Sequence, residues 1–264
     1  MRSAGRAIVL VLLFAAPLAG QEADPLARAR QLYNQRDYDG AIAAADEGRA
    51  SAGRADAADL VAARAFLERY RQTAAEDDLA SARARLRTLN PQRFDARERS
   101  EFVVGLGAAL YFEDLPGPAA SVFASLLDGS HALEDGAREK LLDWWASALD
   151  RDARPRPEQE RQLVYRRVRE RMRAELAANP ASAVAAYWLA AAAAGEGDWQ
   201  GAWDEAQAGW VRAALTPDHG AILLADLDRL VQRAIAPERA RTLEQPADQL
   251  LQEWTAFKER WTRQ

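Results

Sequence analysis

Residues 183–215 constrain the possible folds of this chain more than any other stretch. Alanine, tryptophan and tyrosine fill two segments, AVAAYWLAAAAA and WQGAWDEAQAGWVRAAL, on either side of a short turn that contains Gly195, Gly197 and Asp198. Small residues let two helix backbones approach closely, and bulky residues between them fill the remaining space. The pattern therefore predicts two helices folded back on each other as a helical hairpin.

The rest of the chain shows helical spacing as well. Its apolar residues recur mostly every three to five positions, and no segment alternates in the two-residue pattern of strands. With 264 residues, 49% of them hydrophobic, the chain is large enough to bury a core. We therefore predict an all-α protein, with further helices within residues 24–50, 56–70, 77–89, 101–127, 137–150, 157–178, 218–235 and 246–264.

Two helices near the C-terminus carry pronounced apolar faces. In the first, one face consists of Ile222, Leu223, Leu227, Leu230, Val231 and Ile235. In the last, one side consists of Leu250, Trp254, Phe257 and Trp261. Between them, a separate short segment is expected to begin at Pro237.

Three stretches resemble tetratricopeptide repeats (TPRs), a family of helix-turn-helix units. RDYDGAI at residues 36–42 and GDWQGAWDEA at 197–206 are similar to the family's turn and second helix, and LGAALY at 106–111 is similar to its first helix. The clearest repeats are residues 24–50, 101–128 and 183–215. The resemblance implies one domain over residues 24–264, a TPR-like α-solenoid of antiparallel helix pairs closed by a C-terminal capping helix.

The N-terminus has the layout of a secretory signal peptide over residues 1–20. Arg2 and Arg6 precede an apolar run, and Pro17 and Gly20 follow it. The run covers residues 7–16, which is short of the roughly 20 residues that span a bilayer. Gln21 stands where a lipoprotein would have its lipidated cysteine. We expect an exported bacterial protein, periplasmic or secreted, with no transmembrane segment after cleavage.

The composition of the chain excludes several kinds of functional site. The chain has no cysteine, which excludes disulfides, thiolate metal sites and a cysteine nucleophile. Its net charge of −5 is a poor match to nucleic acid, whose binding needs a concentrated basic face. The two histidines, His131 and His219, are far apart, and no metal or nucleotide motif is present, so we expect no cofactor and no metal.

Catalysis would have to come from carboxylates, the two histidines, hydroxyls or arginines, and one pair of acidic residues is considered as a catalytic pair. Asp143 and Asp150 lie seven residues apart around Trp144 and Trp145 and therefore share a helix face, as a general acid and base might in a glycosidase. Salt bridges are the alternative role for such a pair on an arginine-rich chain. The carboxylates of the Asp226-Leu227-Asp228 sequence point about 200° apart on a helix and could not share one metal ion.

Partner-binding candidates come from the resemblance alone. TPR proteins bind partners through the first helix of each hairpin, which faces the concave side. Carried over by position, this implies six residues, for each of which core packing is the alternative role: Arg30, Tyr33, Tyr111, Phe112, Tyr187 and Trp188.

The sequence thus favours a non-enzymatic module or scaffold of the bacterial cell envelope that binds a protein or peptide in a concave groove. Two alternatives remain open. One is an enzyme that processes envelope glycan or peptide with acidic residues near Trp144 and Trp145, and the other is a structural subunit of an envelope assembly. The oligomeric state is left open.

Export can be tested directly. Expression of the full chain in a bacterial host with a general secretion pathway should yield a periplasmic or secreted product whose N-terminus lies near Gln21, because signal peptidase cuts after small residues such as Ala19 and Gly20. N-terminal sequencing of that product gives the cleavage site. Recovery of uncleaved chain in the cytoplasm would contradict the prediction.

Overall fold

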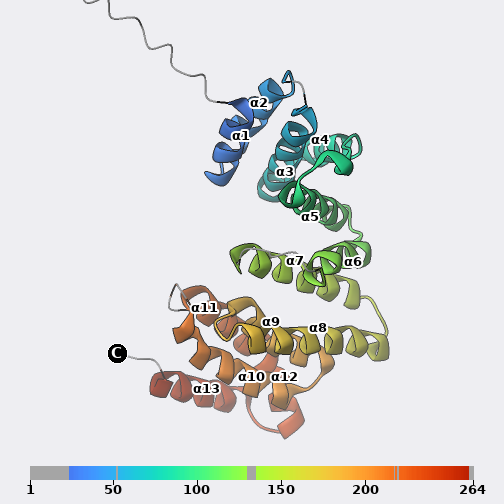
Figure 1. Cartoon of the computed structure of the whole chain (residues 1–264). Helices are drawn as coiled ribbons and strands as arrows, with labels where there is room; N and C mark the ends of the chain where they lie inside the picture. The colour runs from blue at the N-terminus through green and yellow to red at the C-terminus, as the bar shows by residue number, and fades with distance from the viewer. Residues whose placement is uncertain (1–23, 52, 130–134, 217, 219, 262–264) are drawn as a thin grey trace, which may run out of the picture.

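The computed structural model describes residues 24–51, 53–129, 135–216, 218 and 220–261, and every regular element in these ranges is a helix (Figure 1). The all-α prediction is confirmed for this part of the chain. The signal peptide predicted at residues 1–20, together with His131 and His219, lies outside the described residues. None of the described helices combines the length and the apolar character that a membrane span requires.

The elements follow one another along the chain with short connections. In order they are α1 (Pro25–Asn34), α2 (Tyr38–Gly48), α3 (Ala55–Thr73), α4 (Glu76–Leu86), the 3-10 helix η1 (Pro91–Arg93), α5 (Ala96–Phe112), α6 (Pro116–Leu127), α7 (Asp135–Ala153), α8 (Glu158–Ala178), α9 (Ala183–Glu196), α10 (Trp199–Arg212), the 3-10 helix η2 (Ala213–Leu215), α11 (Ala221–Leu230), the π-helix η3 (Val231–Ile235), α12 (Ala236–Leu243) and α13 (Ala247–Trp261).

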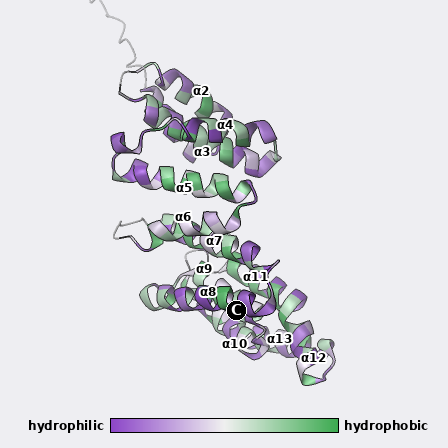
Figure 2. Ribbon diagram, turned by 90° about the vertical axis from the view of Figure 1, so that its right-hand side faces the viewer, coloured by the Kyte–Doolittle hydropathy of each residue, from purple (hydrophilic) through white to green (hydrophobic). Residues whose placement is uncertain are grey.

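The helices stack in sequence order, from α1 and α2 at one end of an elongated molecule to α13 at the other (Figure 1). Each helix up to α11 packs against the next one along the chain. Odd-numbered helices also contact one another, in the pairs α1–α3, α3–α5, α7–α9 and α9–α11. Hydrophobic and hydrophilic residues alternate along the labelled helices (Figure 2), as expected when each helix buries only one face.

A shared type of turn folds one helix back onto the preceding helix at four places. One residue of each turn has a positive φ angle: 64° at Arg36, 60° at Asp114, 81° at Gly197 and 54° at Glu244. The next amide donates a hydrogen bond to a carbonyl five residues earlier, in the pairs Asp37–Leu32, Leu115–Leu110, Asp198–Ala193 and Gln245–Ala240. The first three turns lie in the three stretches that the sequence marks as the clearest repeats.

Two of these turns also share the start of their second helix. Asp37 Oδ1 accepts from the Gly40 amide at 3.0 Å, and Asp198 Oδ1 accepts from the Gly201 amide at 2.8 Å. Glycine at the third helical position leaves room for the capping carboxylate in this orientation, because a Cβ on Gly40 would lie 2.5 Å from Asp37 Oδ2. This cap explains in physical terms why the two motifs at residues 36–42 and 197–206 look alike.

Residues that face each other across a helix pair compensate in size, so that a smaller residue on one helix meets a larger residue on the other. Counted from the positive-φ residue, Gly107 of α5 is equivalent to Ala29 of α1, and Phe123 of α6 is equivalent to Ala45 of α2. Ala29 and Ala45 are both fully buried, and so is Phe123. A Cβ on Gly107 would lie 2.7 Å from Phe123 Cδ1, so glycine makes room for the phenyl ring that replaces an alanine.

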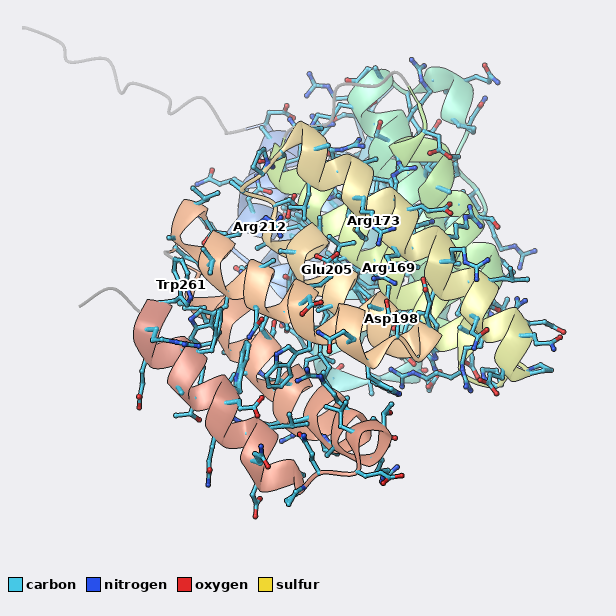
Figure 3. All side chains as sticks on the ribbon, turned by 90° about the horizontal axis from the view of Figure 1, so that it is seen from below. Arg169, Arg173, Asp198, Glu205, Arg212 and Trp261 are labelled. Carbon is cyan, nitrogen blue, oxygen red and sulfur yellow. The ribbon has the colours of Figure 1, made fainter. Side chains whose placement is uncertain are left out.

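The C-terminal end differs from the sequence prediction in two details. The chain remains helical through Pro237, because the π-helix η3 precedes α12 and its wider hydrogen-bonding pattern accommodates a residue that lacks an amide hydrogen. In α13, Leu250, Trp254 and Phe257 are buried as predicted, but Trp261 is 55% exposed at the end of the helix (Figure 3).

Close packing at Gly107 can be tested by substitution. Gly107→Leu should lower the free energy of unfolding by about 2 kcal/mol or more, because the new side chain would overlap the buried Phe123 ring. Gly136→Ala is the matched control, since a Cβ at this exposed position of α7 meets no atom within 4 Å. Urea unfolding followed by circular dichroism measures both. A Gly107→Leu change within about 0.5 kcal/mol of wild type would contradict the contact.

Candidate functional site

A hollow of about 630 Å³ opens on the face formed by the odd-numbered helices. Helices α5, α7, α9 and α11 and the turn after α7 provide its lining, and among the described residues no even-numbered helix contributes to it. The lining residues are Tyr111, Asp143, Ser147, Asp150, Arg151, Arg154, Ala183, Val184, Tyr187, Trp188, Ile222, Leu223 and Asp226.

Three of the six residues predicted from the resemblance meet in this hollow. Tyr111 comes from the end of α5, and Tyr187 and Trp188 come from the first half of α9. Although they are separated by more than 70 positions in the chain, the stacking of α5, α7 and α9 brings them to one surface. The hollow is therefore the place where sequence and structure point to the same residues.

The other three predicted residues lie elsewhere. Phe112 packs edge-on against Tyr70 and Trp144, with ring centroids 5.1 and 5.6 Å away, and joins α3, α5 and α7. The Arg30 guanidinium pairs with Glu98 at 2.6 Å and lines a second hollow, of about 260 Å³, near the N-terminal end. Tyr33 lies under the Arg64 guanidinium, which is 4.5 Å from its ring centroid. The six residues thus do not form one continuous surface.

A hydrogen bond between α7 and α9 organises the floor of the hollow. Trp188 is 7% exposed, and its indole Nε1 donates to Asp143 Oδ1 at 2.9 Å. The bond satisfies the one polar atom of the largely buried indole and holds the Asp143 carboxylate in place. Trp188 therefore supports the floor rather than offering its ring face to a partner.

Tyr187 stands beside Trp188 with three carboxylates around it. Its ring centroid is 5.5 Å from that of Trp188, at an interplanar angle of 81°. Burial raises the pKa of the Tyr187 hydroxyl above its ordinary value, and the negative charges of Asp226, Asp150 and Asp143 raise it further. This part of the hollow is therefore aromatic and electronegative.

Most charges in the lining are already compensated. Asp150 accepts hydrogen bonds from the Tyr165 hydroxyl at 2.8 Å and from Arg154 Nη2 at 2.5 Å. Arg151 pairs with Asp114 at 3.0 Å and lies 5.3 Å from the Tyr111 ring centroid. Asp226 pairs with Arg229, one turn away on α11, at 3.0 Å.

Asp143 and Asp150, which the sequence marks as a possible acid–base pair, have different surroundings. Asp143 and Asp150 line the same hollow, as their spacing predicts, but they are offset by about 10.5 Å along the axis of α7. Both oxygens of Asp150 are also engaged, by Tyr165 and Arg154.

Asp226 and Asp228 diverge as predicted. Asp226 faces the hollow, whereas Asp228 Oδ1 accepts from Trp254 Nε1 at 2.7 Å and from Lys258 Nζ at 2.6 Å on the other side of α11. Within the described ranges, no group of three or more histidine and acidic side chains is placed to hold a metal ion.

Several contributors to the hollow were not found from the sequence as site residues, and two of them lie on α11. Ile222 was assigned to the apolar core face of its helix, but it is 72% exposed at the edge of the hollow. Asp226 lies one turn further along α11 on the same side. The spacing of four residues between them is visible in the sequence, but which face of α11 is left open depends on how the helix packs on α9 and α10.

Comparisons of the chain with protein-family models, with curated proteins and with solved structures find no match.

The environment of Tyr187 can be tested by pH dependence. In unfolded chains Tyr187 ionises near its ordinary pKa of about 10, whereas in the folded protein it keeps its proton to higher pH. The free energy of unfolding of the wild type should therefore fall as pH rises above about 10, and that of the Tyr187→Phe variant should fall less steeply. Urea unfolding between pH 8 and 11.5 measures the two slopes.

Asp226→Asn is the matched variant for this experiment. It keeps the hydroxyl of Tyr187 but removes one nearby negative charge. The decrease of its free energy of unfolding with pH should therefore be intermediate between those of the wild type and Tyr187→Phe. Equal slopes for the wild type and Tyr187→Phe would contradict the assigned environment.

Proposed function

We propose that this chain is an exported, non-enzymatic binding module of the bacterial cell envelope, built as a TPR-like α-solenoid. The repeated turn supports this architecture, because a residue in the left-handed conformation and a hydrogen bond of the same spacing recur in the three stretches that resemble TPRs. Contacts among odd-numbered helices also support it, since stacked helix pairs bring the first helices of neighbouring pairs together.

The C-terminal helix fits the role of a cap in this proposal. Leu250, Trp254 and Phe257 bury one side of α13 against the preceding helices. Polar residues, including Gln252, Glu253 and Thr255, lie on its exposed side. A stack of helix pairs needs such a helix because its last pair would otherwise expose an apolar surface.

Binding in the hollow is the proposed activity, and the observation that carries it is the make-up of the lining. Four odd-numbered helices converge there, with aromatic side chains at the floor and charged side chains around them. Pockets with an apolar or aromatic floor and a few placed polar groups are typical binding sites. A hollow that spans four helices and opens to solvent can accept a short segment of a protein partner.

Export is the second part of the proposal, and it is supported by the arrangement of charge, apolar run and small residues at 1–20. The absence of cysteine is compatible with an oxidising compartment, where a free thiol would be a liability. The partner is accordingly expected among proteins of the cell envelope.

A substitution that fills the hollow tests the proposal. Ser147 lies in the lining on α7, and Ser147→Trp would place an indole in the open space. Ala174→Trp on the exposed side of α8 is the matched control. Cross-linking and affinity capture from envelope extracts should recover a stoichiometric partner with the wild type and the control but not with Ser147→Trp. The same recovery with all three proteins would contradict binding in the hollow.

A further inference from the structure

The charges in the hollow reveal one negative group without a counter-ion. The Asp150, Arg151 and Asp226 side chains each have an oppositely charged partner within 4 Å. Among the described residues, Asp143 has no cationic side chain within that distance, and its one hydrogen-bond donor is the neutral indole of Trp188. The hollow therefore carries an uncompensated negative charge.

The position of Asp143 makes this charge available. Its Oδ1 is held by Trp188 Nε1, and its Oδ2 accepts no hydrogen bond from the described part of the chain. The side chain is exposed, although the indole that orients it is 7% exposed. A preoriented carboxylate with one open oxygen is a strong acceptor for an ammonium or guanidinium group.

The surroundings add contacts suited to the rest of a basic side chain. Tyr187 provides an aromatic ring near Asp143 and Asp226, and cations are attracted to such rings. Ile222 and Val184 supply apolar surface in the same hollow, and Ile222 is 72% exposed. Lysine and arginine combine an aliphatic stem with a charged end and match both features.

An acidic partner segment fits less well. Arg151 and Arg154 are the basic residues of the lining, and each is already paired, with Asp114 and Asp150 respectively. A carboxylate of the partner would meet guanidinium groups whose charge is already compensated, whereas an ammonium group meets a carboxylate without a cationic partner among the described residues. The net charge of −5 also favours the approach of a positively charged segment.

We infer that the hollow binds an extended, basic segment of a partner protein and that one lysine or arginine of that segment lies between Asp143 and Asp226 against Tyr187. The inference rests on the proposed function and specifies the chemistry of the partner. Apolar residues next to the basic one contact Ile222 and Val184. Charge selects the segment, and the aromatic and apolar surface adds affinity.

Selection from a library of short random peptides displayed on phage tests this inference. The full chain is the target, and each selected peptide is then measured by fluorescence anisotropy against wild type and Ser147→Trp to show that it binds in the hollow. Peptides that bind there should share a lysine or arginine at one position. Replacing that residue by norleucine should weaken binding to the wild type roughly tenfold, the effect of one charge-assisted hydrogen bond.

Asp143→Asn is the decisive variant because asparagine can still accept from Trp188 Nε1 but carries no charge. It should bind the lysine and norleucine peptides with nearly equal affinity. Asp204→Asn, at an exposed position of α10, is the matched control and should retain the full preference. The coupling in this cycle isolates the contact between the peptide cation and Asp143.

The outcomes separate this inference from the proposed function. Peptides that bind in the hollow without a shared basic residue, or an Asp143→Asn variant that keeps the preference, would overturn the inference and leave binding in the hollow intact. Failure to select any peptide whose binding is abolished by Ser147→Trp would count against the proposed function and the inference together.

Discussion

The left-handed turn between paired helices is the constraint on which the remaining structure depends. At Gly197 the positive φ angle is free of side-chain strain, but Arg36 and Asp114 adopt it at a cost on the order of 1 kcal/mol each. The strain is tolerated because the reversal lets two apolar faces meet. At Gly197 the turn is also tied to α8, since Arg169 donates to Asp198 at 2.8 Å and to Glu196 at 3.3 Å (Figure 3).

From α1 to α11 the helices alternate between two sides of the stack, and neighbouring odd-numbered helices contact one another in four pairs. Aromatic side chains join several of these helices. Tyr70 of α3 contacts Phe112 of α5, and Phe112 contacts Trp144 of α7. Tyr111 also contacts Trp144, at 5.3 Å between ring centroids. These rings hold α5 and α7 in the positions from which Tyr111 and Asp143 reach the hollow.

Local features of the fold could be predicted from the sequence, because they depend on neighbours along the chain. The caps at Asp37 and Asp198, and the apolar faces of the helices, follow from spacings of three to five residues. Tyr111 and Phe112 show the limit of this reasoning. Both were assigned to one binding face, but adjacent helical residues point about 100° apart, and only Tyr111 lines the hollow.

Contacts between distant helices explain the remaining differences. Trp188 was a candidate for a partner-facing side chain, but Asp143, 45 residues earlier, accepts its indole hydrogen and fixes it in the floor. Ile222 belongs to an apolar stripe in the sequence, yet α11 packs so that Leu223 and Leu227 are buried and Ile222 is left at the edge. Neither outcome can be read from periodicity, because both depend on the orientation of one helix on another.

The same long-range packing gives the hollow its polarity. Carboxylates on α7 and α11 approach Tyr187 from two sides, whereas the arginines of the lining come from the C-terminal end of α7 and the turn after it, where Asp114 and Asp150 already pair with them. Asp143 differs because Trp188 orients its carboxylate without neutralising it. A buried indole can do this because it donates one hydrogen bond and carries no charge. Packing of α9 against α7 therefore closes the floor and, within the described part of the chain, leaves the Asp143 carboxylate oriented but without a cationic partner.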